Sequence, residues 1–282
     1  MEEFYIEYFI ENKYEHPVRK ASYQLLIIPE TNAQQIVSDL KFYSSENQEI
    51  HFSTNIFGFE TINYYINKPF TEFWFKLSAS IKKQKVNPFY VSPLLPADEF
   101  ELIHSLDFLI ENSLFLTPTE LTKMPSFVNF SFPEYSGEIQ IFEYLLNLTS
   151  FLFQLLEYSP ESTDVNTPIE EVLRIRKGVC QDYAHLFISV CRKNKIPVRY
   201  VSGYLNQGAG FTGTSQLHAW AEALIPELGW VGFDATNNLV ADHHYLKIAH
   251  GTDYRDCSPI IGILETTGTQ KSTHSVIVSS NQ

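Results

Sequence analysis

Hydrophobic and polar residues alternate over short stretches in the first part of the chain, which is the period of a half-buried β-strand. Strands are predicted at residues 22–28, 49–53, 61–66 and 72–81, with turn residues such as Pro29, Gly58 and Pro69 between them. This pattern predicts a small antiparallel β module over residues 1–85.

The alternation is lost over residues 86–138, where six prolines interrupt the chain. A short helix is predicted at residues 98–105. We interpret this stretch as a connector that packs on both of its neighbours.

A helical period begins near residue 139. Apolar residues recur at steps of three and four over residues 140–158, which predicts a buried helix. Thr167 as the N-cap and Pro168 in the first turn predict a second helix over residues 168–174. A third helix is predicted to begin at or near Cys180, buried along one side. Its apolar stripe comprises Cys180, Tyr183, Ala184, Phe187, Val190, Cys191 and Asn194.

Strand patterns follow at residues 198–205, 217–225 and 229–233, and residues 274–279 are one more candidate strand. Residues 139–282 are therefore expected to form an α+β catalytic domain, in which the helix that begins at Cys180 packs on an antiparallel sheet. The sequence contains no internal repeat and no low-complexity segment.

Composition narrows the possible partners. The 282 residues are 44% hydrophobic, enough for a sizeable core, and carry a formal net charge of −13, which argues against a nucleic-acid ligand. The first residues are acidic where a signal peptide would be basic, and no apolar stretch is long enough for a membrane span. We expect a soluble cytoplasmic protein that does not bind a membrane, and make no prediction of its oligomeric state.

Cys180 is the candidate nucleophile. The chain has three cysteines, an odd number without framework spacing, so reduced thiols are expected. A thiol at a helix N-terminus meets the positive end of the helix dipole, which favours the thiolate. Cysteine is also a common buried core residue, and position alone does not separate the two interpretations. Cys191 is interpreted as core and Cys257 as structural.

His218 and Asp234 are the candidate base and its orienting carboxylate. If residues 217–225 and 229–233 form a hairpin that turns near 226–228, these two residues lie opposite or diagonal on one face of the sheet. The carboxylate would hold one imidazole nitrogen and leave the other for the thiol. A pair of exposed polar residues at strand ends is the alternative.

Trp220 shares the face of His218, while Ala219, Ala221 and Ala223 lie on the other face, where the helix of Cys180 is expected to pack. Trp220 and Tyr204 are candidate substrate-binding residues, although a large core aromatic is the simpler interpretation of Trp220.

The other histidines are not expected to act. His185 lies about 140° around the helix from Cys180. Asp242, His243, His244 and His250 could suggest a metal site, but adjacent histidines in a strand would point to opposite faces and no tetrahedral ligand spacing is present. A solvated loop is the preferred interpretation of these residues. No calcium-loop pattern is present, so we expect no metal and no cofactor.

Four sequence motifs occur in order: Gly-Val-Cys-Gln-Asp-Tyr-Ala at 178–184, Ile-Pro-Val-Arg-Tyr-Val-Ser-Gly-Tyr at 196–204, His-Ala-Trp-Ala-Glu at 218–222, and Gly-Trp-Val-Gly-Phe-Asp-Ala-Thr-Asn at 229–237. Over residues 140–265 the chain resembles the bacterial and archaeal branch of the transglutaminase-like superfamily, which has a papain-like fold. Residues 1–85 resemble the β module that often precedes this domain in bacteria. Ala235 stands where the family usually has Pro, and Thr252 where it has Arg.

The resemblance implies that Cys180, His218 and Asp234 form a catalytic triad for acyl transfer on the amide of a peptide or protein substrate, through a thioester. Cysteine protease or amidase activity is the first expectation. Protein-glutamine transamidation is the alternative within the same chemistry, and a catalytically silent peptide-binding module is the alternative from another class.

Overall fold

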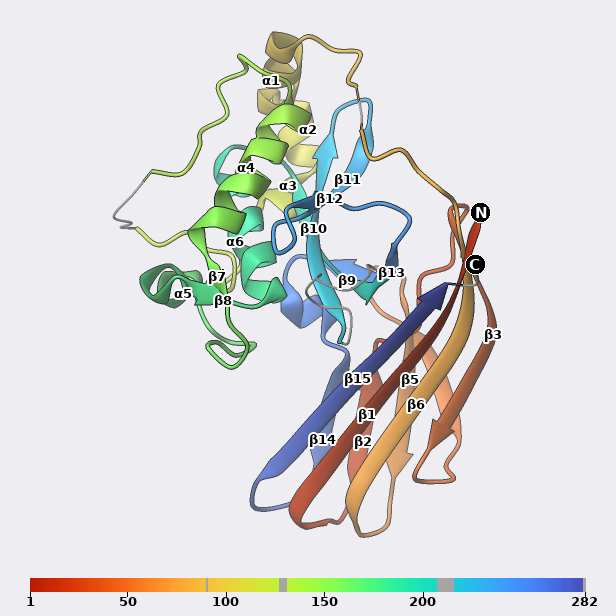
Figure 1. The fold of residues 1–282 in the computed structure, drawn as a ribbon. Coiled ribbons are helices and arrows are strands. Elements are labelled where there is room, and N and C mark those ends of the chain that lie inside the picture. The colour runs from red at the N-terminus through yellow and green to blue at the C-terminus, as the bar shows by residue number, and fades with distance from the viewer. Residues whose placement is uncertain (90, 127–130, 207–215, 281–282) are drawn as a thin grey trace.

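Two antiparallel sheets pack face to face in one half of the protein, whose computed structural model describes residues 1–89, 91–126, 131–206 and 216–280 (Figure 1). The first sheet has the order β15 (Gln270–Ser280), β1 (Glu2–Val18), β6 (Phe70–Lys83) and β3 (Gln35–Ser44). The second has the order β14 (Ile260–Leu264), β2 (Ala21–Leu25), β5 (Glu60–Ile66) and β4 (Ile50–Thr54). Tyr23 of β2 stacks on Phe73 of β6, with ring centroids 4.3 Å apart, so aromatic side chains fill the space between the sheets.

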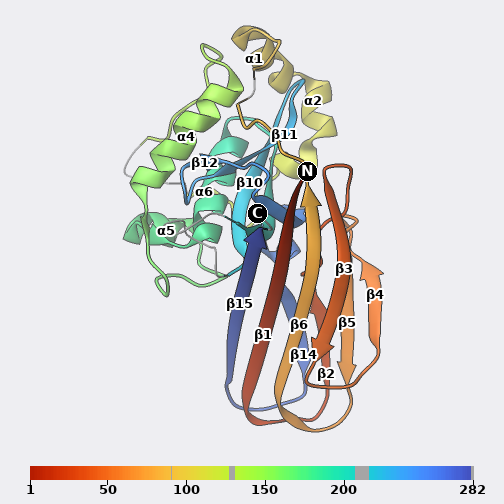
Figure 2. The same ribbon diagram turned by 45° about the vertical axis from the view of Figure 1, so that its right-hand side comes forward.

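The sequence predicted β2, β4, β5 and β6 but missed three strands of this half. β1, β3 and β14 were not predicted, although β1 is the longest strand among the described residues. The predicted strand at 274–279 forms, as part of β15, but it pairs with β1, from Phe4 opposite Ser280 to Tyr14 opposite Gln270. β14 likewise pairs with β2. The chain thus returns to the N-terminal sheets after the second half is complete (Figure 2).

A third antiparallel sheet forms the other half. Its order is β12 (Leu239–Val240), β11 (Gly229–Asp234), β10 (His218–Ile225), β9 (Val198–Leu205) and β13 (Tyr245–Gly251). Helices α4 (Ile141–Leu155) and α6 (Cys180–Lys193) pack on this sheet, where Ala219, Ala221 and Ala223 join their core (Figure 1). The small side chains of β10 allow the close approach of α6, as predicted.

Short elements complete this half. β7 (Glu157–Tyr158) and β8 (Lys177–Gly178) form a parallel pair, and α5 (Ile169–Ile175) lies between them in sequence. The 3₁₀ turn η1 (Tyr254–Cys257) follows β13. The N-cap of α5 is Pro168 and not Thr167 as predicted. The Thr167 hydroxyl accepts a hydrogen bond from Asp164 N at 2.8 Å and donates one to the Asp164 carboxylate, so it bonds to the preceding turn and not to the helix.

The connector carries three helices, α1 (Pro96–His104), α2 (Leu106–Glu111) and α3 (Ser113–Leu116), of which the sequence predicted only the first. They also explain why the predicted one-sided burial of α6 is wrong. The Arg192 guanidinium of α6 donates to Phe115 O at 3.1 Å and to the Thr122 hydroxyl at 2.6 Å. The connector therefore covers the polar side of α6, and even Arg192 is buried.

The observed class is α+β, with antiparallel sheets and a central helix that begins at Cys180, as predicted. No helix within the described part of the chain is both long and apolar enough to cross a membrane.

Candidate active site

Cys180 is the first residue of α6, and several contacts fix the backbone that leads into it. The Asp182 carboxylate accepts a hydrogen bond from Val179 N at 2.8 Å and another from the Thr163 hydroxyl at 2.6 Å. A Cβ at Gly178 would lie 2.7 Å from Asp182 Cβ, so only glycine leaves room for this carboxylate. Burial raises the pKa of Asp182 to about 6, although the two hydrogen bonds oppose the shift. Asp182 therefore holds the start of the helix at a cost in desolvation.

The three cysteines differ in exposure. Cys180 is half-buried, whereas Cys191 and Cys257 are buried, in agreement with the core and structural roles expected for the latter two. Burial raises the pKa of Cys191 and of Cys257. Neither is suited to act as a thiolate, which leaves Cys180 as the thiol with access to solvent.

His218 and Asp234 meet across the hairpin of β10 and β11. Ala221 lies opposite Phe233, and this register places Asp234 diagonal to His218 on the same face. His218 Nε2 lies 2.7 Å from Asp234 Oδ2, and the two residues are 1% and 0% exposed. The contact between His218 and Asp234 that the predicted hairpin implied is present, and the alternative of two exposed polar residues is excluded.

Asp234 accepts hydrogen bonds from several other groups. Tyr245 donates its hydroxyl to Oδ2 at 2.8 Å, the Asn237 amide donates to Oδ2 at 2.8 Å, and Thr236 N donates to Oδ1 at 2.9 Å. Burial alone would raise the pKa of Asp234, but the charge and hydrogen bonds of its neighbours, His218 first, lower it below its ordinary value. Asp234 is thereby kept as a carboxylate that can stabilise an imidazolium.

The second nitrogen of His218 is the one available for chemistry. Nδ1 is buried and has no hydrogen-bond partner among the described residues. Burial lowers the pKa of His218, but Asp234 and then Cys180 raise it, and the net shift is upward. His218 thus interacts electrostatically with both residues and can connect them, with Nε2 on the carboxylate side.

Trp220 covers His218. Their rings are stacked with centroids 6.4 Å apart and planes at 24°, and Trp220 is 2% exposed. A Cβ at Gly203 would lie 2.6 Å from the Trp220 ring, so the strand next to it must have glycine there. Trp220 packs with Val201, Leu205 and Tyr245, on the face opposite the alanines.

Tyr204, the other candidate for substrate binding, is fully buried and donates its hydroxyl to Ile27 O at 2.7 Å. This placement offers a substrate no contact with the side chain. The structure therefore assigns Tyr204 to the junction of the two halves, and we do not retain it as a substrate-binding residue.

Sequence reasoning missed the roles of Tyr245 and Asn237 as partners of Asp234 and treated Asp182 only as a residue favoured by the helix dipole. Asn237 was part of a recognised motif. The acidic residue three positions after Val179 could have suggested that its carboxylate accepts a hydrogen bond from the N-cap backbone, as in a capping box. Tyr245 could not be placed, because β13 was not predicted.

The remaining histidines lie away from this site. His185 is buried and accepts a hydrogen bond from Tyr254 N at 3.1 Å, and burial first, with Arg192 next, lowers its pKa to about 3. His243 and His244 precede β13 in a turn, as expected of a loop, whereas His250 lies within β13, which corrects the interpretation of that residue.

A cysteine at the start of a helix, packed on an antiparallel sheet that carries a histidine–aspartate pair, defines a papain-like core. Residues 134–235, which include Cys180, His218 and Asp234, match the model of the transglutaminase-like superfamily. This part of the chain is therefore similar to the transglutaminase-like superfamily.

Relatives extend this comparison. An uncharacterized protein of Mycobacterium tuberculosis is 34% identical over 165 residues, which cover 55% of this chain and 52% of the relative. An uncharacterized protein of Mycobacterium leprae is 38% identical over 117 residues, or 40% and 41% of the two chains. The chain thus spans about half the length of these relatives. A protein-glutamine gamma-glutamyltransferase of Pseudomonas aeruginosa is 34% identical over 83 residues, covering 27% of this chain and 12% of that protein.

One solved structure covers the whole chain. It is described as a "putative cysteine protease" from Cytophaga hutchinsonii, and it superposes with a TM-score of 0.78 over 100% of this chain and 91% of that chain, at 23% identity. The similarity shows a shared fold that includes both halves of the molecule.

Proposed function

We propose that this protein is a cysteine-nucleophile enzyme that hydrolyses amide bonds in peptides or proteins. The observation that carries the proposal is the buried His218–Asp234 pair, in which Nε2 of His218 faces the carboxylate and Nδ1 has no hydrogen-bond partner among the described residues. Burial lowers the pKa of this imidazole, but Asp234 and then Cys180 raise it, in keeping with a thiol on the Nδ1 side. Titratable groups with shifted pKa values cluster at functional sites, which favours an enzyme over a silent binding module.

In the proposed reaction the Cys180 thiolate attacks the carbonyl carbon of the amide and forms a C–S bond. The tetrahedral intermediate collapses with cleavage of the C–N bond, and His218 Nδ1 gives its proton to the leaving nitrogen. Water then attacks the thioester while His218 takes up a proton, and the acid is released with regeneration of the thiol. Asp234 keeps the imidazole oriented and stabilises its charge throughout.

The start of α6 offers donors for the oxyanion. Asp182 N and Tyr183 N bond to Val179 O, so the backbone N–H groups of Cys180 and Gln181 precede the first hydrogen bonds of the helix. We assign these two groups as candidate oxyanion donors, beside the attacking sulfur.

The second candidate function differs in the molecule that attacks the thioester and releases the acyl group from Cys180. The local similarity to a protein-glutamine gamma-glutamyltransferase favours transamidation, in which an amine replaces water. Substrate and acceptor are decided together by one experiment on a library of glutamine-containing peptides, incubated with and without an added primary amine and analysed by mass spectrometry.

Hydrolysis predicts peptide cleavage or a gain of about 1 Da by deamidation, unchanged by the amine. Transamidation predicts a mass increase that follows the amine used. Cys180→Ala should abolish either product, while Cys257→Ala, a change at a buried thiol, should retain activity in the folded fraction. Absence of any product, together with equal behaviour of the wild type and Cys180→Ala, would favour the binding module.

A further inference from the structure

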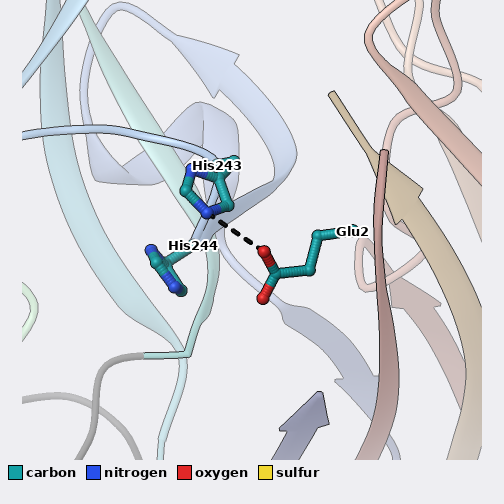
Figure 3. A group of neighbouring side chains, drawn as sticks. All are labelled: Glu2, His243 and His244. Atoms are coloured by element: carbon teal, nitrogen blue, oxygen red, sulfur yellow. Dashed lines mark ion pairs between the residues drawn. The ribbon is translucent and has the colours of Figure 1, made fainter. Parts of the chain in front are cut away.

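Glu2, His243 and His244 bring three potential metal ligands together (Figure 3). Glu2 lies at the start of β1, in the N-terminal sheets, and the two histidines lie in the turn before β13, in the catalytic half. One ligand atom from each residue lies within 4.8 Å of the others. Nothing in the proposed acyl transfer uses this group.

The two histidines face the same region because they are not in a strand. Their rings have centroids 4.2 Å apart and planes at 36°, whereas neighbouring residues of a strand would point to opposite faces. The sequence argument against a metal here assumed a strand. It does not apply to the turn that forms.

The distances suit a transition-metal ion. His243 Nε2 lies 3.3 Å from Glu2 Oε2, and donors bound to tetrahedral zinc at about 2.0–2.1 Å lie roughly 3.4 Å apart. His244 Nδ1 lies 3.0 Å from Asp242 Oδ1, a carboxylate–imidazole contact that orients the ring and leaves its Nε2 for an ion. A modest shift of His244 would complete three protein ligands, with a further position for water.

The charges around the cluster also allow an ion. Two carboxylates, Glu2 and Asp242, face it, and the cation that now pairs with Glu2 is Lys85, at 2.9 Å. The Lys85 side chain is 66% exposed, so an exposed ion pair worth little would be exchanged for a coordinate bond. Glu2 and His243 are only 22% and 16% exposed, which limits competition from water.

We propose that Glu2, His243 and His244 bind a divalent transition-metal ion of the zinc type, and that the ion ties the first strand to the catalytic half. His244 is followed by Tyr245, which bonds Asp234, so the bound ion would hold the segment that supports the carboxylate of the active site. The site is independent of the proposed reaction and would exist in a catalytically silent protein.

Titration of the purified, metal-free chain with Co²⁺, followed by its visible absorption, tests this site directly. We expect one Co²⁺ per chain with the spectrum of nitrogen and oxygen ligands, displaced by Zn²⁺. Glu2→Gln, His243→Gln and His244→Gln should each weaken binding about 10- to 100-fold, since even partners of metal ligands contribute that much. His51→Gln, which changes a histidine on β4, should leave binding unchanged.

Circular dichroism shows whether each variant is folded, and Glu2→Gln changes a partly exposed side chain without altering its size. Cys180→Ala distinguishes this site from metal capture by the active thiol. Absence of Co²⁺ and Zn²⁺ binding, binding that survives all three ligand substitutions, or a sulfur-to-metal absorption band lost in Cys180→Ala would overturn the proposal.

Discussion

The polar side chains that support the active site are buried and hydrogen-bonded to one another. Asp234 receives hydrogen bonds from His218 of β10, from Tyr245 of β13 and from the turn between β11 and β12, and the same carboxylate fixes His218. Asp182 plays a corresponding role for the helix, where it holds the residue before Cys180. The sequence predicted Cys180, His218 and Asp234, because their spacing and motifs are local. It did not predict the partners that orient them, since those depend on tertiary packing.

Asp182→Asn should change how stability varies with pH. The folded-state pKa of Asp182, about 6, lies above its unfolded value, so this carboxyl adds stability at acidic pH that is lost as pH rises through about 6. The loss amounts to about 3 kcal/mol for a shift of this size. We therefore expect the free energy of unfolding to fall less between pH 4 and pH 7 in Asp182→Asn than in the wild type.

Urea unfolding at both pH values measures this difference. The carboxylates common to the two proteins cancel in the comparison. An identical pH dependence of the wild type and the variant would show that Asp182 titrates as an ordinary exposed carboxyl.

Whole elements were predictable where the hydrophobic period is clear. α4, α6 and the β10–β11 hairpin follow from local sequence. β1 was missed because Tyr5 and Phe9 place large apolar groups on its outer face and hide the alternation of the buried face. β13 was missed because it contains Lys247, which is buried only because it forms an ion pair with Glu222 at 2.7 Å.

Gly203→Ala tests the packing of Trp220, which lies over His218, against Gly203 of the neighbouring strand β9. The new Cβ would clash with Leu246 O and would lie 2.6 Å from the Trp220 ring, so β13 or Trp220 must move. Overpacking of this kind costs about 1–3 kcal/mol, and we expect a loss of that size in the free energy of unfolding together with reduced activity.

Gly262→Ala on β14 is the matched control, because its Cβ would meet the Tyr23 ring at 3.3 Å, a contact that is tight but does not involve the active site. If the two variants were equally stable and equally active, Trp220 would not be packed as described.

The whole molecule is closed by its C-terminal strands. β14 and β15 pair with β2 and β1, more than two hundred residues earlier in the chain. Local periodicity carries no information about such pairing, which is why the sequence placed residues 139–282 in one domain. We propose that the N-terminal module consists of residues 1–85 together with residues 260–280.

Two fragments test this division. Residues 1–85 alone would expose the edges of β1 and β2, and we expect no cooperative unfolding transition. Joining residues 260–280 to that fragment through a flexible linker should restore the transition in thermal denaturation. Cooperative unfolding of residues 1–85 alone would contradict the proposed module.

The central claim is that His218, held by Asp234, activates the thiol of Cys180. Alkylation by iodoacetamide under native conditions, with the modified cysteines identified by mass spectrometry, tests it most directly. We predict that Cys180 reacts far faster than Cys257, and that His218→Gln slows Cys180 by at least about tenfold, equivalent to about 1.4 kcal/mol, without unfolding the chain. A Cys180 that reacts no faster than Cys257, or at the same rate in the wild type and His218→Gln, would contradict the account.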